Sequence, residues 1–149
     1  MFDTVLIAGL GLMGGSMAKT IKARTLSRVL GWNRTRATAE QALADGSIDA
    51  IATEALYKEA DLVIIGLYPQ ATVDWLLENM PKMKKGCVIV DMVGVKQFMV
   101  DHLEQAALDA GVHYVGGHPM AGREFSGLDY SLPTLFDGAS MIFVPTKSS

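Results

Sequence analysis

The stretch that decides the fold is Gly9-Leu10-Gly11-Leu12-Met13-Gly14, which follows an apolar run at residues 4–8 and opens a helical pattern. In such a strand, turn and helix, Gly9 allows the tight turn, Gly11 leaves room for a pyrophosphate, and Gly14 lets helix and strand pack closely. The helix N-terminus presents unpaired amides to an anion. The stretch therefore predicts a dinucleotide-binding unit, with Leu12 and Met13 also contacting the cofactor, and the alternative is a purely structural glycine turn.

Short β-branched runs alternate with longer helical patterns along the rest of the chain. Strands are predicted at residues 4–8, 28–32, 62–66, 87–91, 113–116 and 140–144, with a weaker one around Ile51. Helices are predicted at residues 13–23, 35–44, 71–80 and 96–110, and Gly46 and Gly111 lie where glycines end helices. The pattern predicts an α/β fold of the Rossmann type, doubly wound around a mainly parallel sheet.

The chain has 149 residues, of which 50% are apolar, and a net charge of -3. This length suits one domain with a substantial core. No apolar run reaches the roughly 18 residues of a membrane span, and no basic region precedes the first strand, so we predict a cytoplasmic protein without a signal peptide. The dispersed cations predict a small-molecule substrate, with neither nucleic acid nor a membrane as partner. The single cysteine, Cys87, opens an apolar run and is expected to be buried, and no metal is predicted.

The second predicted strand ends at Asn33-Arg34-Thr35, where NAD enzymes usually place an acid for the ribose hydroxyl. Without a carboxylate, a 2'-phosphate would meet a guanidinium, a hydroxyl and the start of a helix. These three residues are therefore predicted to bind the cofactor, with NADP favoured and NAD as the second choice. The alternative is that Arg34 and Arg36 are solvated residues of the first helical turn, although a cation there opposes the helix dipole.

Two further strand ends are expected at the same crevice, because ligands of open α/β sheets bind beyond the carboxyl ends of the strands. Tyr68 and Pro69 are predicted beside the nicotinamide ribose, and Gly94 lets the backbone approach the nicotinamide ring. Asp91 is expected to brace its loop or to cap the next helix. Lys96 is either a solvated helix residue or a contact for an acidic substrate.

A second informative block is Gly116-Gly117-His118-Pro119-Met120-Ala121-Gly122-Arg123-Glu124, closed by Ser126-Gly127. It places an imidazole in a glycine-rich loop after a predicted strand, where α/β enzymes carry their catalytic groups. Because an imidazole exchanges a proton near neutral pH, His118 is the candidate acid/base residue. The alternative is a histidine satisfied within a turn. His102 lies in a polar helical pattern and His113 begins a strand, so neither is assigned a function.

Together these residues resemble the prephenate and arogenate dehydrogenases of tyrosine biosynthesis along essentially the whole chain. The turn at residues 9–14 is shared by many dehydrogenases, whereas the Gly-Gly-His-Pro-Met-Ala-Gly block with Glu124 and Ser126-Gly127 is specific to this family. Residues 91–96 and 135–138 also match. The resemblance implies an NAD(P)-dependent oxidoreductase that converts prephenate or arogenate by oxidative decarboxylation.

The resemblance also implies roles for single residues. The matching histidine, His118, hydrogen-bonds the ring hydroxyl of prephenate as hydride leaves for the nicotinamide, and carbon dioxide is lost as the ring becomes aromatic. Such a role suits an unprotonated imidazole, which takes the hydroxyl proton while positive charge builds at the carbinol carbon. Glu124 is implied at the rim of the substrate pocket, and Arg123, Ser126 and Lys96 are further candidates for substrate contact.

The chain departs from the family pattern in two places. Many members carry Gly-Ser-Val-Lys where this chain has residues 93–96, with the serine bonded to the catalytic histidine, and here Gly94 takes the place of that serine. Members also continue into an all-helical domain that forms a homodimer and supplies arginines for the substrate carboxylates, and this domain is absent from the 149 residues. Residues 1–149 are therefore predicted to be the NAD(P)-binding domain, with little turnover alone.

Two other functions agree with parts of the sequence. A β-hydroxyacid dehydrogenase shares the glycine turn and often an Asn-Arg-Thr after the second strand, but the block around His118 is not expected in it. A non-enzymatic NADP sensor needs the glycine turn and Arg34 but has no use for His118. The histidine block is therefore the feature that separates the three functions.

Overall fold

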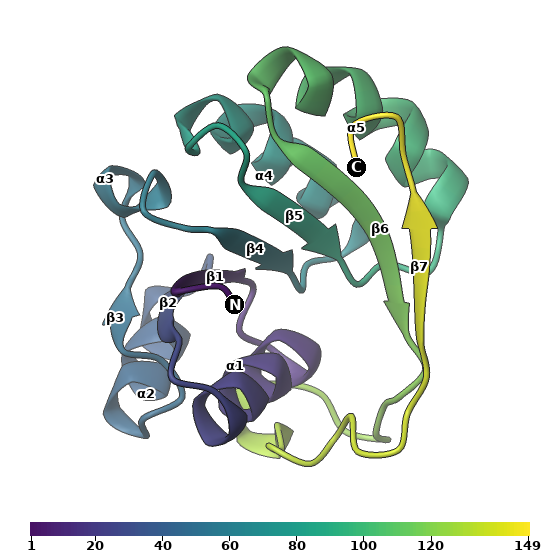
Figure 1. Ribbon diagram of the computed structural model, residues 1–149. Coiled ribbons are helices and arrows are strands. Elements are labelled where there is room, and N and C mark those ends of the chain that lie inside the picture. The colour runs from purple at the N-terminus through teal and green to yellow at the C-terminus, as the bar shows by residue number, and fades with distance from the viewer.

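Seven strands form one sheet in the computed structural model, which describes residues 1–149 (Figure 1). They are β1 (Thr4–Ala8), β2 (Arg28–Trp32), β3 (Ala50–Ile51), β4 (Leu62–Ile65), β5 (Val88–Asp91), β6 (His113–Pro119) and β7 (Met141–Pro145). Their order is β3-β2-β1-β4-β5-β6-β7, and all neighbours are parallel except β6 and β7. This is a doubly wound Rossmann-type sheet with an antiparallel strand at one edge, and it confirms the predicted fold class.

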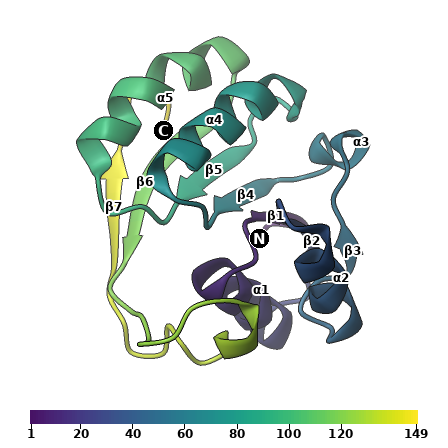
Figure 2. The same cartoon turned by 180° about the vertical axis from the view of Figure 1, so that it is seen from behind.

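Five helices connect the strands. They are α1 (Leu12–Arg24), α2 (Arg36–Ala44), α3 (Glu54–Tyr57), α4 (Pro69–Asn79) and α5 (Lys96–Ala110), with short 3-10 turns at Met80–Lys82 and Leu128–Tyr130. The helices α4 and α5 lie on one face of the sheet, and α1 and α2 lie on the other (Figures 1 and 2). None of these helices has the length and apolarity that a membrane crossing requires.

The apolar side chains form two buried clusters, one on each face of the sheet. The larger has 21 buried residues and joins Leu76 of α4 and Leu103 of α5 to the sheet, whereas the smaller has 10 and includes Ala18 of α1. Alternate residues of β1 enter the two clusters, with Leu6 in the larger and Ile7 in the smaller. Both faces of this central strand are apolar because parallel sheets are normally covered on both sides.

Most predicted elements are confirmed to within two residues at each end, and residues 96–110 form α5 as predicted. The exception is β6, which was predicted to end at Gly116 and continues to Pro119. Its extra residues pair with the antiparallel β7, and His118 lies opposite Ile142. The prediction that His118 lies in a loop is therefore wrong, because a strand from a distant part of the sequence supplies hydrogen-bond partners that no local pattern reveals.

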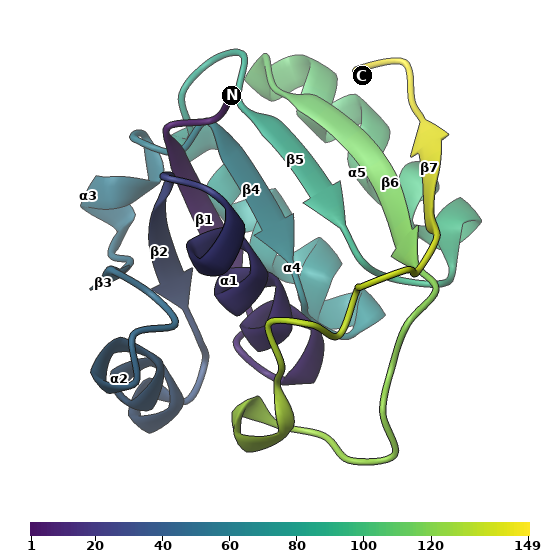
Figure 3. The same cartoon turned by 60° about the horizontal axis from the view of Figure 1, so that its bottom comes forward.

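The connection between β6 and β7 passes along α1 (Figures 1 and 3). The amide of Leu132 donates to Oγ of Ser16 at 2.9 Å, and the Lys19 ammonium donates to the Ser131 carbonyl at 3.2 Å. The helix tolerates this close contact because it carries Gly15, where a Cβ would lie 2.8 Å from a methyl carbon of Leu128. The segment after His118 is thus anchored to the helix that begins at the glycine turn.

Candidate dinucleotide-binding and proton-transfer site

The turn between β1 and α1 is built from close approaches of the backbone. Gly9 has a φ of +94°, and a Cβ there would lie 2.7 Å from the carbonyl oxygen of Gly66. A Cβ on Gly14 would lie 1.7 Å from the carbonyl oxygen of Gly9, so neither position accepts a side chain. A Cβ on Gly11 would meet nothing within 4 Å. The space beside Gly11 is therefore open, as the binding of a pyrophosphate at this turn requires.

This turn lies where the strand order reverses, between β1 and β4, and open α/β sheets bind their ligands at this point. The helices α1, α2, α4 and α5 begin at this carboxyl edge, and none has a side-chain cap or an acidic residue in its first turn. The first amides of α1, α2 and α5 are unpaired donors, whereas Pro69 at the start of α4 has no N–H, and Leu12 and Met13 supply two of these donors. This donor set fits the pyrophosphate of a dinucleotide.

Asn33 joins the glycine turn to the end of β2. Its Oδ1 accepts the amide of Leu10 at 2.9 Å, and its Nδ2 donates to the carbonyl of Thr35 at 3.0 Å. Arg34 and Thr35 are exposed beside it. Arg36 pairs with a glutamate of its own helix at 3.2 Å, whereas Arg34 forms no ion pair. Of these two guanidinium groups, that of Arg34 is therefore the one available to an anionic ligand.

Tyr68 and Pro69 lie at the same edge, after β4. Pro69 is the first residue of α4, and the Tyr68 side chain caps nothing and is 86% exposed. The hydroxyl of Thr72 donates to the carbonyl of Leu67 at 3.0 Å and holds the turn that carries them. Both residues have the predicted position, and their contact with a cofactor stays a prediction.

His118 and Gly94 lie together, although they come from the ends of different strands. A Cβ on Gly94 would lie 3.4 Å from Cε1 and 3.7 Å from Nδ1 of the His118 ring. The Nδ1 atom is buried and has no hydrogen-bond partner, whereas Nε2 is not buried in this way. The imidazole therefore offers Nε2, and not Nδ1, to a ligand.

Asp91 ends β5 as a fully buried carboxylate. Its Oδ1 accepts the ammonium of Lys96 and the amide of Val93, the latter at 3.0 Å, and its Oδ2 accepts the hydroxyl of Tyr114. Burial, helped by the Asp91 charge, raises the pKa of Tyr114, so its hydroxyl remains a donor. The Lys96 side chain is only 15% exposed. Because its ammonium already compensates Asp91, this arrangement gives no support to Lys96 as a substrate contact.

The remaining candidates lie on the exposed connection that follows β6. Arg123 donates from Nη1 to the carbonyl of Tyr130 at 2.6 Å, and its guanidinium carbon is 5.9 Å from the centroid of that ring. Glu124 and Ser126 are exposed. Their contacts with a substrate, and that of Arg123, stay predictions.

Two residues of this site were missed in the sequence. Gly66 packs against the glycine turn, where a Cβ on it would lie 3.1 Å from the amide nitrogen of Gly14. A glycine at the end of an apolar strand is a readable signal of such an approach. Tyr114 carried no such signal, because nothing in an apolar strand shows that one hydroxyl faces a carboxylate of the neighbouring strand.

Known proteins resemble this chain in sequence and in fold. Residues 17–149 match the family model described as the nucleotide-binding domain of prephenate dehydrogenase. The chain is 38% identical over 153 residues to the prephenate dehydrogenase of Bacillus subtilis, and the match covers 100% of this chain and 41% of that protein. The chain thus spans less than half the length of this curated relative.

Two solved structures show the same likeness. A prephenate dehydrogenase from Aquifex aeolicus, in complex with hydroxyphenyl propionate and NAD+, superposes with a TM-score of 0.89 at 29% identity and covers 100% of this chain. An arogenate dehydrogenase from Synechocystis superposes with a TM-score of 0.86 at 25% identity and covers 97% of it. The matched region is 52% of the first and 51% of the second of these chains.

Proposed function

This chain belongs to the prephenate dehydrogenase family, and from that premise we propose that residues 1–149 form the NAD(P)-binding domain of a dehydrogenase of tyrosine biosynthesis. The proposed reaction is the oxidative decarboxylation of prephenate or arogenate. The observation that carries the proposal is the His118 ring, which has only Nε2 open and lies at the same sheet edge as the open glycine turn.

The residues of this edge divide into groups that each fit one part of the cofactor. The amides of Leu12 and Met13 would hold the pyrophosphate beside Gly11, and Arg34 with Thr35 would meet the adenine ribose. Tyr68 and Gly94 would flank the nicotinamide half, which supplies the hydride acceptor when it is bound. The assignment is supported by the free space at Gly11 and by the absence of first-turn acids from α1, α2, α4 and α5.

His118 takes the proton of the substrate's ring hydroxyl at Nε2 in this proposal, because Nδ1 is buried against Gly94. The ring must be unprotonated at Nε2 and carry its hydrogen on Nδ1. As the carbinol carbon loses hydride, its hydroxyl becomes a carbonyl and the proton passes to His118. Loss of the ring carboxylate as carbon dioxide then returns an electron pair to the ring, and the aromatic phenol recovers the proton.

The catalytic part of the proposal is tested in the enzyme extended to the length of its relatives. We expect His118→Asn to lower kcat by roughly a hundredfold to ten-thousandfold, with both prephenate and arogenate as substrates. The matched control is His102→Asn, which changes an exposed histidine on α5 whose Nδ1 contacts the Phe98 carbonyl. Turnover of His118→Asn equal to that of the parent would exclude His118 as the proton acceptor.

The preference for NADP over NAD is a separate part of the proposal, and the unpaired Arg34 supports it. Intrinsic tryptophan fluorescence, to which Trp32 at the end of β2 contributes together with the adjacent Trp75, follows titration of the chain with either dinucleotide. We expect Arg34→Ala to weaken NADP binding about tenfold to a hundredfold and to leave NAD binding unchanged. Arg36→Ala is the matched control. Because the Aquifex relative holds NAD+, NAD is the second candidate, and equal or tighter binding of NAD would exclude the preference.

We propose further that the rest of the longer enzyme completes the substrate site and forms a homodimer. Prephenate carries two carboxylates. Of the two candidate cations, Lys96 is paired with the buried Asp91, whereas Arg123 is not paired with a buried carboxylate. A carboxylate left unpaired in a partly dry cleft costs several kcal/mol. The 149 residues should therefore bind the cofactor with little turnover, and light scattering of the longer protein should give the mass of a dimer.

A further inference from the structure

The ladder between β5 and β6 ends before it reaches His118. Its last pair joins Val90 to Val115, and β6 then continues with β7 as its only strand partner. The side of β6 that faces the connection from β5 to α5 therefore has no main-chain ladder from Gly116 to His118. Side chains must hold the histidine backbone on this side.

The Asp91 carboxylate spans this gap. Its Oδ1 accepts the amide of Gly117 at 3.5 Å, in addition to the amide of Val93 at 3.0 Å and the ammonium of Lys96. One carboxylate thus bonds to Gly117, which precedes His118, and to Val93, which precedes Gly94. Asp91 is fully buried and Lys96 is the cation bonded to it, so the bridge depends on this lysine for its charge.

The two glycines before His118 are explained by the same network. A Cβ on Gly116 would lie 3.0 Å from Cδ of Lys96, and a Cβ on Gly117 would lie 2.4 Å from the carbonyl oxygen of Asp91. Neither glycine has a positive φ. Glycine is therefore required here by the close approach of neighbouring atoms and not by an unusual backbone conformation. The double glycine therefore lets the Asp91 and Lys96 pair lie directly against β6.

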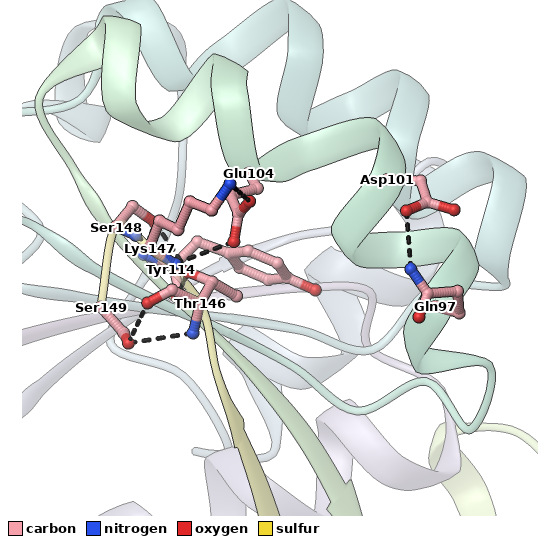
Figure 4. A network of polar contacts seen from close by, with 8 residues as sticks. All are labelled: Gln97, Asp101, Glu104, Tyr114, Thr146, Lys147, Ser148 and Ser149. Atoms are coloured by element: carbon pink, nitrogen blue, oxygen red, sulfur yellow. Dashed lines mark hydrogen bonds and ion pairs between the residues drawn. The ribbon is translucent and has the colours of Figure 1, made fainter.

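Tyr114 completes the network and ties it to the C-terminal segment (Figure 4). Its hydroxyl donates to Oδ2 of Asp91. Its amide donates to Oγ of Ser148 at 3.1 Å, and its carbonyl accepts the hydroxyl of Thr146 at 2.6 Å, in the C-terminal segment that Figure 4 draws beside it. The side chain is fully buried. A tyrosine held at both its main chain and its hydroxyl fixes the second oxygen of the carboxylate.

We propose that Asp91, Lys96 and Tyr114 are positioning residues that hold the His118 ring over Gly94 with Nε2 open. The proposal rests on the proposed function, in which His118 accepts a proton. No hydrogen bond to Nδ1 fixes the ring, so its orientation depends on the main chain that the three side chains hold. Lys96 acts through Asp91 and not on a ligand.

The test uses histidine side-chain NMR of the 149-residue chain. Long-range proton–nitrogen spectra report the tautomer of His118, and the nuclear Overhauser effect between its Hε1 and the Hα protons of Gly94 reports their proximity. The network variants are Tyr114→Phe and Lys96→Met. The controls are Tyr57→Phe, which changes a buried tyrosine of α3, and Lys84→Met, which breaks an ion pair with Asp61 at the opposite edge of the sheet.

Both network variants are expected to lose the Overhauser effect and to change the populations of the two tautomers, whereas both controls keep the parent signals. Thermal unfolding first establishes that each variant is folded, and Tyr114→Phe carries the test alone if Lys96→Met does not fold. Parent signals in folded Tyr114→Phe would overturn the proposal. Loss of the signals in folded Tyr57→Phe would also overturn it, because the effect would then be general to the core.

These measurements need neither cofactor nor substrate, so they are independent of the proposed function. In the enzyme of full length, Tyr114→Phe should lower kcat on the order of a hundredfold while the KM for the cofactor stays unchanged, because a misplaced imidazole affects the chemical step. An unchanged kcat together with a lost Overhauser effect would overturn the positioning role. Full activity of His118→Asn would instead remove the proposed function.

Discussion

Gly94 leaves the His118 ring with an unsatisfied polar atom. If Nε2 is to accept a proton, Nδ1 must carry hydrogen, and this N–H is buried without an acceptor. A buried donor without a partner costs about 1–3 kcal/mol. Many members of the family have a serine at this position, whereas this chain has Gly94. The His118 ring must therefore be held through packing and the backbone.

A serine at this position should restore the missing hydrogen bond. The Cβ of Gly94→Ser would lie 3.7 Å from Nδ1, so its oxygen can reach hydrogen-bond distance. We expect a larger population of the tautomer with hydrogen on Nδ1, measured by the nitrogen chemical shifts of the ring. Gly94→Ala is the matched control, because it adds the carbon without the oxygen. The same shift in both variants would contradict this explanation.

Cys87 should be chemically inert in the folded protein. Burial raises the pKa of its thiol to about 12, so the thiolate that reacts with disulfide reagents is nearly absent at mildly alkaline pH. We expect a thiol-specific disulfide reagent to modify the chain only when denaturant unfolds it, as followed by absorbance. Rapid modification in native buffer, at a rate equal to that of the denatured chain, would show that the thiol is accessible.

At the scale of elements, two glycines of the turn between β1 and α1 are expected to have different roles: Gly14 is required for stability and Gly11 for binding. A Cβ on Gly14 collides with the Gly9 carbonyl at 1.7 Å, whereas a Cβ on Gly11 meets open space. We expect Gly14→Ala to lower the free energy of unfolding by about 2 kcal/mol or more. Gly11→Ala should cost at most about 1 kcal/mol, since alanine is a poor N-cap, yet weaken NADP binding about tenfold or more.

Denaturant unfolding and dinucleotide titration of the same samples check this pair of variants. The two substitutions add the same atom three residues apart, so each serves as the control for the other. Equal losses of stability would contradict the packing argument. Unchanged dinucleotide affinity of Gly11→Ala would show that the open space beside it is not the pyrophosphate site.

Asp61 links the segments that lead into β1, β4 and β5, at the amino ends of these strands. The ammonium of Lys84 and the amides of Thr4 and Asp3, the latter two at 2.9 and 3.0 Å, hold the pKa of this carboxyl below its ordinary value. A carboxyl whose pKa is lowered by folding stabilises the fold above its unfolded pKa of about 4. That contribution is lost as the pH falls through the lower pKa of the folded state.

Replacing this carboxyl should therefore matter at neutral pH and not in acid. We expect Asp61→Asn to lower the midpoint of thermal unfolding by a few degrees at neutral pH, and we expect the difference from the parent to vanish once the pH is below the lowered pKa of Asp61 in the folded state. Asp74→Asn, an exposed residue of α4 with only a glutamine partner one turn away, is the control. A difference that persists unchanged in acid would contradict the assigned cause.

At the scale of the whole molecule, the sheet is covered unevenly. The helices α4 and α5 cover one face of its second half, whereas the opposite face of these strands carries no helix (Figures 1 and 2). An apolar groove of about 490 Å³ lies there, and its lining includes Leu62, Ile64, Val88, Val90, Val115 and Phe143. This groove lies on a face of the sheet and not at the carboxyl ends of the strands, so it is distinct from the proposed cofactor site.

An exposed apolar face of this size should bind apolar dyes. We expect the isolated chain to enhance the fluorescence of anilinonaphthalene sulfonate, and Phe143→Ser to weaken the enhancement, because Phe143 lines the groove and is 58% exposed. Ile142→Ser is the control, since its neighbouring side chain is 47% exposed and does not line the groove. Equal effects of the two substitutions would place the dye elsewhere.

The parallel part of the fold was predictable because its signals are local. The glycine turn follows a strand and opens a helix, and α5 has its predicted bounds because Gly111 ends it with a φ of +72°. The end of β6 was not predictable, because its last residues pair with β7 from beyond a long connection. The nearness of His118 and Gly94 was implied by the family resemblance, in which a serine at position 94 bonds the histidine, and it agrees with the rule that parallel strands end at one edge.

The sequence by itself determined the fold class, the family, the glycine turn and the residue types available for proton transfer, because each depends on neighbours in the chain or on a specific motif. Only the tertiary structure decided that His118 belongs to a strand, that its Nδ1 is buried against Gly94, and that Lys96 forms an ion pair with Asp91. These facts depend on distances between separate strands. Burial and pairing are properties of such distances, and no local pattern contains them.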